Sequence, residues 1–254
     1  MRSATPKHLH RVAGVPIVER VIRAGTGAGA GRTLVMVGSN LADLEDHIGT
    51  GDFELVVQGP PKGTADSVRQ ALDRAPEARW MVSLLGDNPL LTPEIVRSLL
   101  RRAEETGSKV TLLTCVVPDA ASYGRIDRDG ENRVRRIVER KNDDASCRQG
   151  PTEINSGVMV LDAEWARREL ASLAVDETTG EFLLTDLVEI AVGQASDGDG
   201  WPVGTHVADE SVSLGVNDRA ELAAADTRAR ARKKAQLMEA GVTFIGPDTV
   251  FIDE

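Results

Sequence analysis

The sequence predicts an α/β fold in which helices cover both faces of a doubly wound, mostly parallel sheet. Two observations predict it. Short, nearly continuous apolar runs recur along the first half of the chain, and such runs are typical of strands covered on both faces. Each run is followed, after a short connection, by a segment with helix-capping signals, and this alternation is typical of doubly wound sheets. With 254 residues, 41% of them hydrophobic, the chain is long enough to bury a sizeable core.

Strands and helices are expected to alternate up to residue 117. The apolar runs predict strands at residues 33–38, 54–58, 80–85 and 109–117. Helices are expected at residues 16–24, 41–48, 64–74 and 93–106. The last helix has the clearest ends, because Thr92 is a good N-cap, Pro93 suits the first helical position and Gly107 follows its end.

The pattern changes after residue 117. Asp129 and Gly130 form a strong hairpin-turn signal. Strands are expected on either side of this turn, at 123–127 and 133–139, and again at 153–162, with helices at 164–172, 182–192 and about 218–240. The last helix contains Arg228, Arg230, Arg232, Lys233 and Lys234. These basic residues suggest a phosphate site, but in so acidic a chain a solvated helix face is the favoured interpretation.

The composition excludes several classes of function. Thirty basic against forty acidic side chains give a formal net charge of −10, which argues against nucleic acid or an anionic membrane as a partner. No apolar run approaches the roughly 20 residues that a membrane-spanning helix needs. Cys115 and Cys147 lack the spacing of a metal site, so a reduced, cytoplasmic protein is expected.

The candidate chemistry lies in loops at the carboxyl ends of strands, where open α/β sheets bind ligands. Asp87 follows the strand expected at 80–85, a position that suits Mg²⁺, which prefers oxygen ligands and phosphate co-ligands; the alternative is a turn or helix-cap aspartate. Gln58 ends another strand, and Gly63 and Thr64 open the next helix. Free N–H groups and close backbone approach there suit a phosphate or a flat ring, although an ordinary strand–helix turn has much the same sequence.

Lys7 follows a proline in an extended stretch, where its ammonium group can face a phosphate. The neighbouring His8 and His10 have the spacing of a metal pair, but no further ligand cluster supports that interpretation. Nor does the chain show a serine, cysteine or histidine constellation for acyl transfer.

Three residues later in the chain fit a sugar. Gly124, Glu139 and Asn155 are expected on neighbouring strand ends. Together they combine close backbone approach with carboxylate and amide partners for hydroxyl groups, which is what recognition of a sugar requires.

A resemblance to a known family emerges from the order of these motifs. The chain contains PKHLH, QGPPKGTA, LLGDNPL, YGRI, IVERK, EINSG, GEFLLTD and GVNDR, in that order. This series resembles the bacterial N-acetylglucosamine-1-phosphate uridylyltransferases, in particular the pyrophosphorylase half of that bifunctional enzyme. The resemblance covers nearly the whole chain, and eight ordered segments are far more specific than any one of them.

The resemblance implies the Rossmann-like fold of the nucleotide-diphospho-sugar transferases. It implies that Asp87 and Asn217 hold Mg²⁺ and that Lys7 and Asp87 are catalytic. The nucleotide-binding residues that it implies are Lys7, Gln58, Gly63, Thr64, Leu85, Gly86 and Asp87. The sugar-binding residues that it implies are Gly124, Glu139, Asn155 and Asn217. The implied substrates are UTP and N-acetylglucosamine-1-phosphate, and the products are UDP-N-acetylglucosamine and pyrophosphate.

The chain departs from the family pattern at both ends. The family opens with a strand and a glycine-rich loop of the form LAAGxGTRM, whereas this chain matches the family pattern only from the end of that loop onward, beginning at Met1. Residues 1–240 are therefore expected to form a nucleotidyltransferase domain without its first strand, and residues 241–254 the start of a left-handed β-helix. No acetyltransferase chemistry is expected, and a homo-oligomer is expected only when the β-helix is present. We expect low stability and at most trace activity without about twenty upstream residues, roughly a strand and a loop.

Two alternative functions remain open at this point. One is transfer of another nucleotide or to another sugar-1-phosphate, because Glu139 and Asn155 suit a sugar without specifying it. The other is a non-catalytic remnant that binds sugar nucleotide weakly or not at all. Pyrophosphate release with a panel of substrate pairs separates all three.

Overall fold

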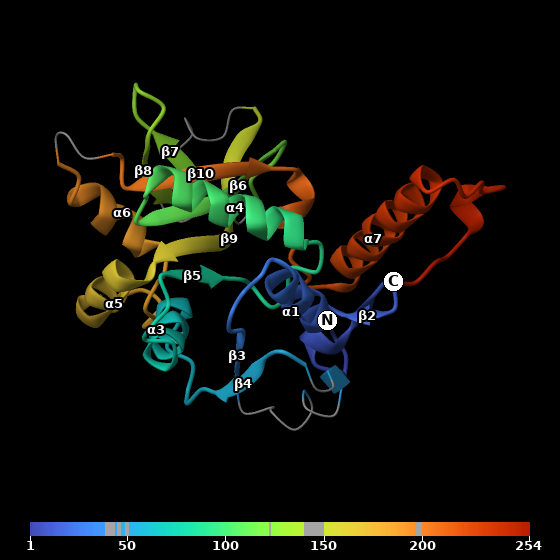
Figure 1. Ribbon diagram of the computed structural model, residues 1–254, viewed down its shortest axis with the longest axis horizontal. Coiled ribbons are helices and arrows are strands. Elements are labelled where there is room, and N and C mark those ends of the chain that lie inside the picture. Colours follow the sequence, from blue (N-terminus) through green and yellow to red (C-terminus); the bar gives the residue numbers. More distant parts are fainter. Residues whose placement is uncertain (39–43, 45–46, 49–50, 122, 140–149, 197–199) are drawn as a thin grey trace.

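The computed structural model describes all 254 residues except 39–43, 45–46, 49–50, 122, 140–149 and 197–199. Its larger sheet has six strands (Figure 1). They are β5 (Trp80–Ser83), β6 (Val110–Val117), β7 (Arg125–Arg128), β8 (Val134–Val138), β9 (Thr152–Asp162) and β10 (Val203–Ala208). β9 runs antiparallel to β5, β6 and β7, whereas β10 runs parallel to β6. The expected α/β class is confirmed, and the sheet is mixed because β9 runs against its neighbours.

Within the described residues, four further strands lie outside this sheet. They are β1 (Arg11–Val12) and β2 (Val15–Pro16), which form a short antiparallel hairpin, and β3 (Leu34–Val37) and β4 (Glu54–Val57), which form a parallel pair. Within the described part of the chain, no ladder joins β3 to β5. The expectation that every apolar run is covered on both faces holds for β6, where seven of eight residues are buried. It is wrong for β3, β4 and β5, which stay largely half-buried or exposed because they have fewer neighbouring elements.

The helices are α1 (Ile17–Gly27), α3 (Thr64–Arg74), α4 (Pro93–Thr106), α5 (Ala163–Ser172), α6 (Asp186–Gly193) and α7 (Arg219–Glu239). α4 has the predicted ends: the Thr92 hydroxyl accepts a hydrogen bond from the Ile95 N–H, and Gly107 has a φ of 64°. The helix expected at 41–48 lies largely outside the described residues. No helix in the described part of the chain is long and apolar enough to cross a membrane.

Besides the short β1–β2 hairpin, which was not predicted, two elements differ most from the sequence prediction. The helix expected at 182–192 begins only at Asp186, because Phe182 and Leu184 bond instead to the loop before α3. β10 was not predicted at all. It contains Gly204 and His206 between its apolar residues, so no continuous apolar run marks it, and its position comes from parallel pairing with β6.

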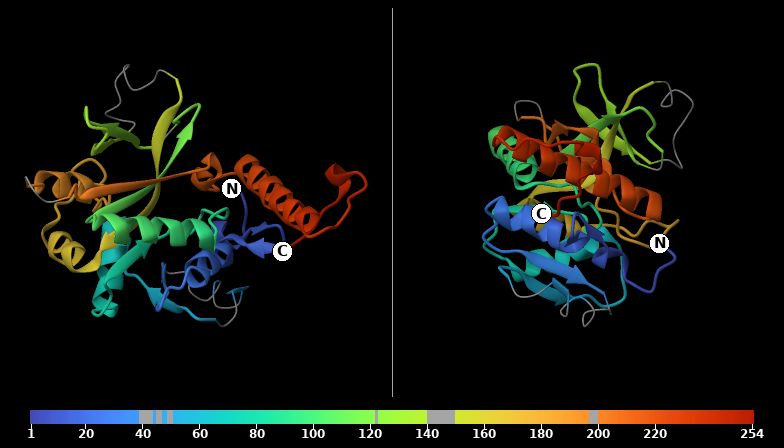
Figure 2. Two further views of the ribbon diagram at one scale, coloured as in Figure 1. Left: turned by 45° about the horizontal axis from the view of Figure 1, so that its top comes forward. Right: turned by 90° about the vertical axis from the view of Figure 1, so that its right-hand side faces the viewer.

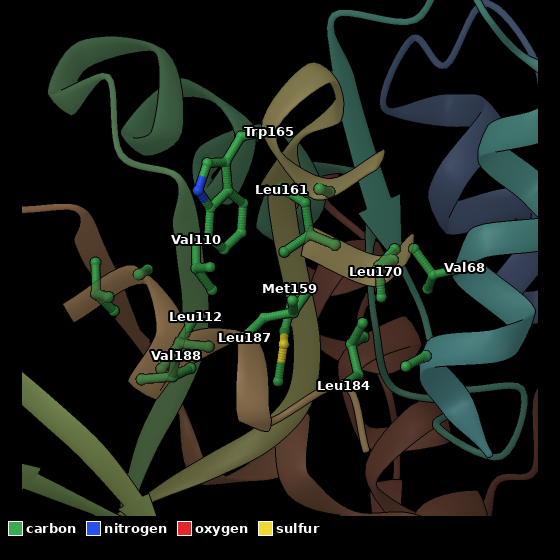
Figure 3. Packing of buried hydrophobic residues seen from close by; sticks show 14 of the residues in the cluster. Val68, Val110, Leu112, Met159, Leu161, Trp165, Leu170, Leu184, Leu187 and Val188 are labelled. Atoms are coloured by element: carbon green, nitrogen blue, oxygen red, sulfur yellow. The ribbon is translucent and has the colours of Figure 1, made fainter. Parts of the chain in front are cut away.

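Helices pack on both faces of β6 and β9. On one face, α3, α5 and α6 surround Met159 and Leu161 (Figure 3). On the other face, Leu99 of α4 belongs to the same cluster as Val160. Val160 and Leu161 are adjacent yet face opposite layers, as the two-residue period of a strand requires. This three-layer arrangement supports the loops at the strand ends.

α7 extends away from the sheets, and the chain then turns back toward β2 (Figures 1 and 2). Four of the basic side chains of α7 have partners within the protein. Arg228 pairs with Glu210, Arg230 with Asp226 and Asp253, and Arg232 and Lys234 donate to the carbonyl groups of Leu90 and Pro247. These contacts give four of the basic residues a structural role, whereas the sequence alone favoured a solvated helix face.

Candidate functional site

Three side chains from distant parts of the chain meet at the end of β5. The Lys7 ammonium group donates hydrogen bonds to Asp87 Oδ2 at 2.7 Å and to Asn217 Oδ1 at 3.0 Å. Lys7 and Asp87 are 30% and 25% exposed, so the pair is within reach of a ligand from solvent. The structure thus brings together the residues that were expected from the sequence to carry the catalysis and to hold the metal.

The elements around this cluster position each side chain. Lys7 begins the short 3-10 helix η1 (Lys7–Leu9), and Asp87 follows β5. The Asp87 carbonyl accepts a hydrogen bond from the Val216 N–H at 2.9 Å, which holds the segment before α7 against the Asp87 loop. The backbone of Asn217 is held because its N–H donates to the Glu221 side chain. Glu221 also forms the capping box of α7 with Asp218.

The oxygen donors in this cluster fit the implied Mg²⁺ ion. The Asp87 carboxylate and the Asn217 amide oxygen converge on one point, which the positive charge of Lys7 occupies. Mg²⁺ is often held by one or two protein oxygen ligands, with phosphates and waters completing its coordination. A site with one carboxylate and one amide oxygen is consistent with this pattern, and no group of three or more His, Cys, Asp or Glu residues in the described part of the chain is arranged to hold a metal ion.

His8 lies beside this cluster, with its ring against Gly86. Burial lowers the pKa of His8, the neighbouring Lys7 charge lowers it further, and Asp87 opposes the shift. The lowered pKa favours the neutral imidazole, which adds no positive charge to the site. Within the described residues, His8 and His10 belong to no group of three or more His, Cys, Asp or Glu side chains that could hold a metal ion.

The three residues expected to bind the sugar also lie together. The Asn155 N–H donates to the Gly124 carbonyl at 2.9 Å. A β-carbon on Gly124 would lie 3.5 Å from Glu139 Oε1 and would collide with Ile137, so only glycine fits between these strands. The Asn155 side-chain oxygen accepts from the Gly157 N–H at 3.1 Å, which orients its amide group.

Leu85 joins the sugar residues to the Asp87 loop. Gly157 has a φ of +84°, and a β-carbon there would collide with the Leu85 side chain. Leu85 therefore packs directly on the strand that carries Asn155, while Gly86 and Asp87 follow it in the chain. This contact links the Lys7–Asp87–Asn217 cluster to the residues that are expected to bind the sugar.

Residues 63–65, which are expected to bind the nucleotide, are in contact with the backbone of residues 182–184. Gly63 has a φ of +100°, and the backbone of Phe182 fills the space where its β-carbon would lie. The Ala65 N–H donates to the Phe182 carbonyl at 3.2 Å, and the Thr64 hydroxyl accepts from the Leu184 N–H. The expectation of free N–H groups is therefore wrong for Ala65. The close approach of the Phe182 backbone accounts for the glycine at position 63.

Gln58 lies at the end of β4, and its side-chain amide donates to the Ser67 hydroxyl at 2.7 Å. Ser67 is on α3, so this bond ties the strand end to the helix after Gly63. Ser67 and the 181–184 segment are two features of the nucleotide side to which no role was assigned from the sequence. GEFLLTD was recognised as a family motif, but only the folded chain shows its contact with residues 62–65.

Similar sequences and folds are found among known proteins. The chain is 37% identical over 255 residues to the bifunctional protein GlmU of Exiguobacterium sibiricum, which covers 99% of this chain and 55% of that protein. It is also 37% identical over 256 residues to GlmU of Trichlorobacter lovleyi, covering 100% of this chain and 54% of that protein. The resemblance indicated by the eight motifs is confirmed, and the chain spans about half the length of these curated relatives.

Solved structures are similar in fold. A crystal structure of HddC from Yersinia pseudotuberculosis complexed with GMP-PN has a TM-score of 0.59 at 17% identity, over 90% of this chain and 92% of that one. A second HddC structure has a TM-score of 0.55 at 18% identity, over 82% and 83%. The family model of the MobA-like NTP transferase domain matches residues 1–144, more than half of the chain. The chain therefore belongs to the family of MobA-like NTP transferase domains.

Proposed function

We propose that this chain catalyses Mg²⁺-dependent uridylyl transfer from UTP to N-acetylglucosamine-1-phosphate. The products are UDP-N-acetylglucosamine and pyrophosphate. Membership of the NTP transferase family and the similarity to GlmU proteins support nucleotidyl transfer. The assignment of the uridine nucleotide and the amino sugar rests on the resemblance of the motifs around Gln58, Glu139 and Asn155.

The observation that carries the proposal is the meeting of Lys7, Asp87 and Asn217 beside a sugar-type cluster. The Lys7 ammonium group lies within 3.0 Å of the Asp87 carboxylate oxygen and of the Asn217 amide oxygen, at the end of β5. Nucleotidyl transfer needs positive charge at this kind of position, because both substrates are polyanions and negative charge shifts to the leaving pyrophosphate.

The reaction needs no covalent intermediate. An oxygen of the sugar phosphate forms a bond to the α-phosphorus of UTP, while the bond from that phosphorus to the bridging oxygen of the β-phosphate breaks. Pyrophosphate leaves with the electron pair, and no proton has to move. Lys7 stabilises the phosphate charge, and Asp87 and Asn217 would hold Mg²⁺. When bound, the ion would neutralise phosphate charge and orient the leaving group.

The sugar cluster orients the attacking substrate. Glu139 and Asn155 bond to hydroxyl and acetamido groups, and Gly124 lets the sugar ring approach the backbone closely. Holding the two substrates in line supplies a large part of the rate enhancement in such a reaction, because it removes the entropy cost of a bimolecular encounter.

Pyrophosphate release from UTP and N-acetylglucosamine-1-phosphate, with and without Mg²⁺, tests the proposal. The expected result is Mg²⁺-dependent release that is faster with this pair than with other nucleoside triphosphates or sugar-1-phosphates. Faster release with another pair would transfer the assignment to that pair. Absence of release with every pair would identify a non-catalytic chain, and a thermal-shift measurement with UDP-N-acetylglucosamine then reports whether it binds the sugar nucleotide.

A further inference from the structure

Arg20 is a buried arginine that donates hydrogen bonds to three different residues. Its side chain is only 7% exposed on α1. Nε donates to the Pro89 carbonyl at 2.8 Å, and one terminal nitrogen donates to the Val12 carbonyl at 3.2 Å. The two terminal nitrogens also donate to the two carboxylate oxygens of Glu254, at 2.7 and 2.9 Å. A buried guanidinium charge is tolerated only with such a paired carboxylate and satisfied donors.

The two carbonyl groups bonded to Arg20 belong to the two segments that meet at the candidate site. Pro89 lies two residues after Asp87, and Val12 lies in the strand that follows the helix of Lys7. Arg20 is thus a common partner of the Lys7 segment and the Asp87 loop. The separation of these segments sets the geometry of the 2.7 Å contact between the Lys7 and Asp87 side chains.

Glu254 reaches Arg20 because the C-terminal tail, residues 247–254, folds back onto the β1–β2 hairpin. The Glu254 N–H donates to the Ala13 carbonyl at 3.0 Å. Arg230 of α7 pairs with Asp253 at 2.9 Å and lies over the ring of Phe251. The tail therefore has its own attachments to α7 and the hairpin, and these attachments bring its carboxylate to the buried guanidinium.

We propose that Arg20 is a positioning residue for nucleotidyl transfer and that the Glu254 carboxylate holds it in place, so that docking of the C-terminal tail sets the geometry of Lys7 and Asp87. This inference rests on the proposed function. Its physical basis is the cost of an unpaired buried charge: without the Glu254 charge, the Arg20 guanidinium turns toward solvent and releases the Pro89 and Val12 carbonyl groups. Displacements of about 1 Å at a reacting centre cost as much as a hundredfold in rate.

Glu254→Gln tests the link, because it keeps the size of the side chain and removes its charge. We expect kcat for pyrophosphate release to fall about tenfold, with the KM for the sugar phosphate within about twofold of the parent. Amide hydrogen exchange should become faster in peptides that cover residues 84–92. Arg20→Lys should have the same effects, because lysine keeps the charge but has three donors, too few for the four hydrogen bonds that Arg20 makes. Glu254→Asp, which keeps the carboxylate, should recover part of the lost turnover.

The matched control is Asp248→Asn, which removes an exposed carboxylate of the same tail but leaves the Arg230–Asp253 and Arg20–Glu254 pairs in place. It should change neither turnover nor exchange at 84–92. Two results for Glu254→Gln would overturn the proposal: turnover and exchange both unchanged, or a general loss of stability with kcat and both KM values altered alike. If the parent releases no pyrophosphate with any substrate pair, the proposed function fails, while the exchange comparison still decides whether Glu254 controls the Asp87 loop.

Discussion

The six-stranded sheet and the β3–β4 pair support different parts of the candidate site. In the larger sheet, β9 has partners on both edges and helices on both faces, and Val160 and Leu161 are fully buried. In the smaller sheet, the two strands share a single ladder, and only Val37 and Val56 are buried. The sugar-type cluster rests on the larger sheet, whereas Gln58, expected to contact the nucleotide, extends from the smaller one.

This difference shows that an apolar strand becomes a buried strand only when its neighbours cover it. The β3–β4 pair has less packing to lose and is expected to open at lower free energy than the β9 region. We therefore expect the part of the site proposed to bind the nucleotide to be the more adjustable one, and the part proposed to bind the sugar to be the more rigid one. Four predictions test this contrast.

The largest expected effect separates two leucine truncations, one in each sheet. Leu161→Ala on β9 removes a fully buried side chain and should lower the free energy of unfolding by about 3–5 kcal/mol. Leu55→Ala on β4 removes a half-buried side chain and should cost roughly 1–2 kcal/mol, since less area leaves water there on folding. Urea denaturation of both variants measures the difference. Equal losses would show that the two sheets are equally well packed.

Asp87→Asn should lower turnover without lowering the stability of either sheet. We expect turnover to fall about a hundredfold, because the charge that faces Lys7 and would hold Mg²⁺ is lost. The thermal midpoint should stay near that of the parent, because the side chain is partly exposed and contributes little packing. Asp73→Asn, an exposed aspartate on α3, is the control for loss of a negative charge. Pyrophosphate release by Asp87→Asn within about threefold of the parent would refute the metal assignment.

A pair of binding variants assigns one substrate to each sheet. Glu139→Ala should raise the KM for the sugar phosphate by one to two decades and leave that for UTP nearly unchanged, since a hydrogen bond to a charged group contributes about 1.5–3 kcal/mol. Gln58→Ala should do the reverse with a smaller effect, about three- to tenfold, because its amide is neutral. Steady-state kinetics with each substrate varied in turn gives both constants. Equal weakening of both substrates by Glu139→Ala would make that residue structural.

The smallest effect compares two ion pairs as the pH changes. Burial alone would raise the pKa of Glu153, but hydrogen bonds from Arg128 and Thr114 outweigh it and hold the pKa below its usual value of 4.5. A lowered folded pKa stabilises the protein above pH 4.5, and this contribution is lost as the pH falls through the lower folded pKa.

Glu153→Gln should therefore cost about 1.5 kcal/mol at pH 7, and the difference from the parent should vanish at acid pH. Glu54→Gln on β4 breaks an exposed pair with Arg32 and should cost almost nothing at either pH. Urea midpoints at pH 7 and at successively lower pH below 4.5 provide the test. A pH-independent cost at Glu153 would mean that packing, not charge, accounts for it.

Local signals predicted much of the fold. The bounds of α3 and α4 were predicted as found, because capping residues and helical periodicity act within a few positions of each other. The β7–β8 hairpin followed from the Asp129–Gly130 turn for the same reason. β10 was missed because its residues carry no strong local pattern and its place depends on the edge of β6.

The sequence by itself determined which side chains stand at the ends of strands and, through its resemblance to a family, which of them are candidates for catalysis. The distances between these side chains depend on the tertiary structure alone. Lys7 and Asn217 are 210 positions apart, and their contact depends on how η1, β5 and α7 pack. The Gly63–Phe182 approach and the Arg20–Glu254 pair have the same origin. Contacts between segments so distant in sequence leave no local periodicity or cap, because they arise only when burial of the core has offset the entropy lost in closing those loops.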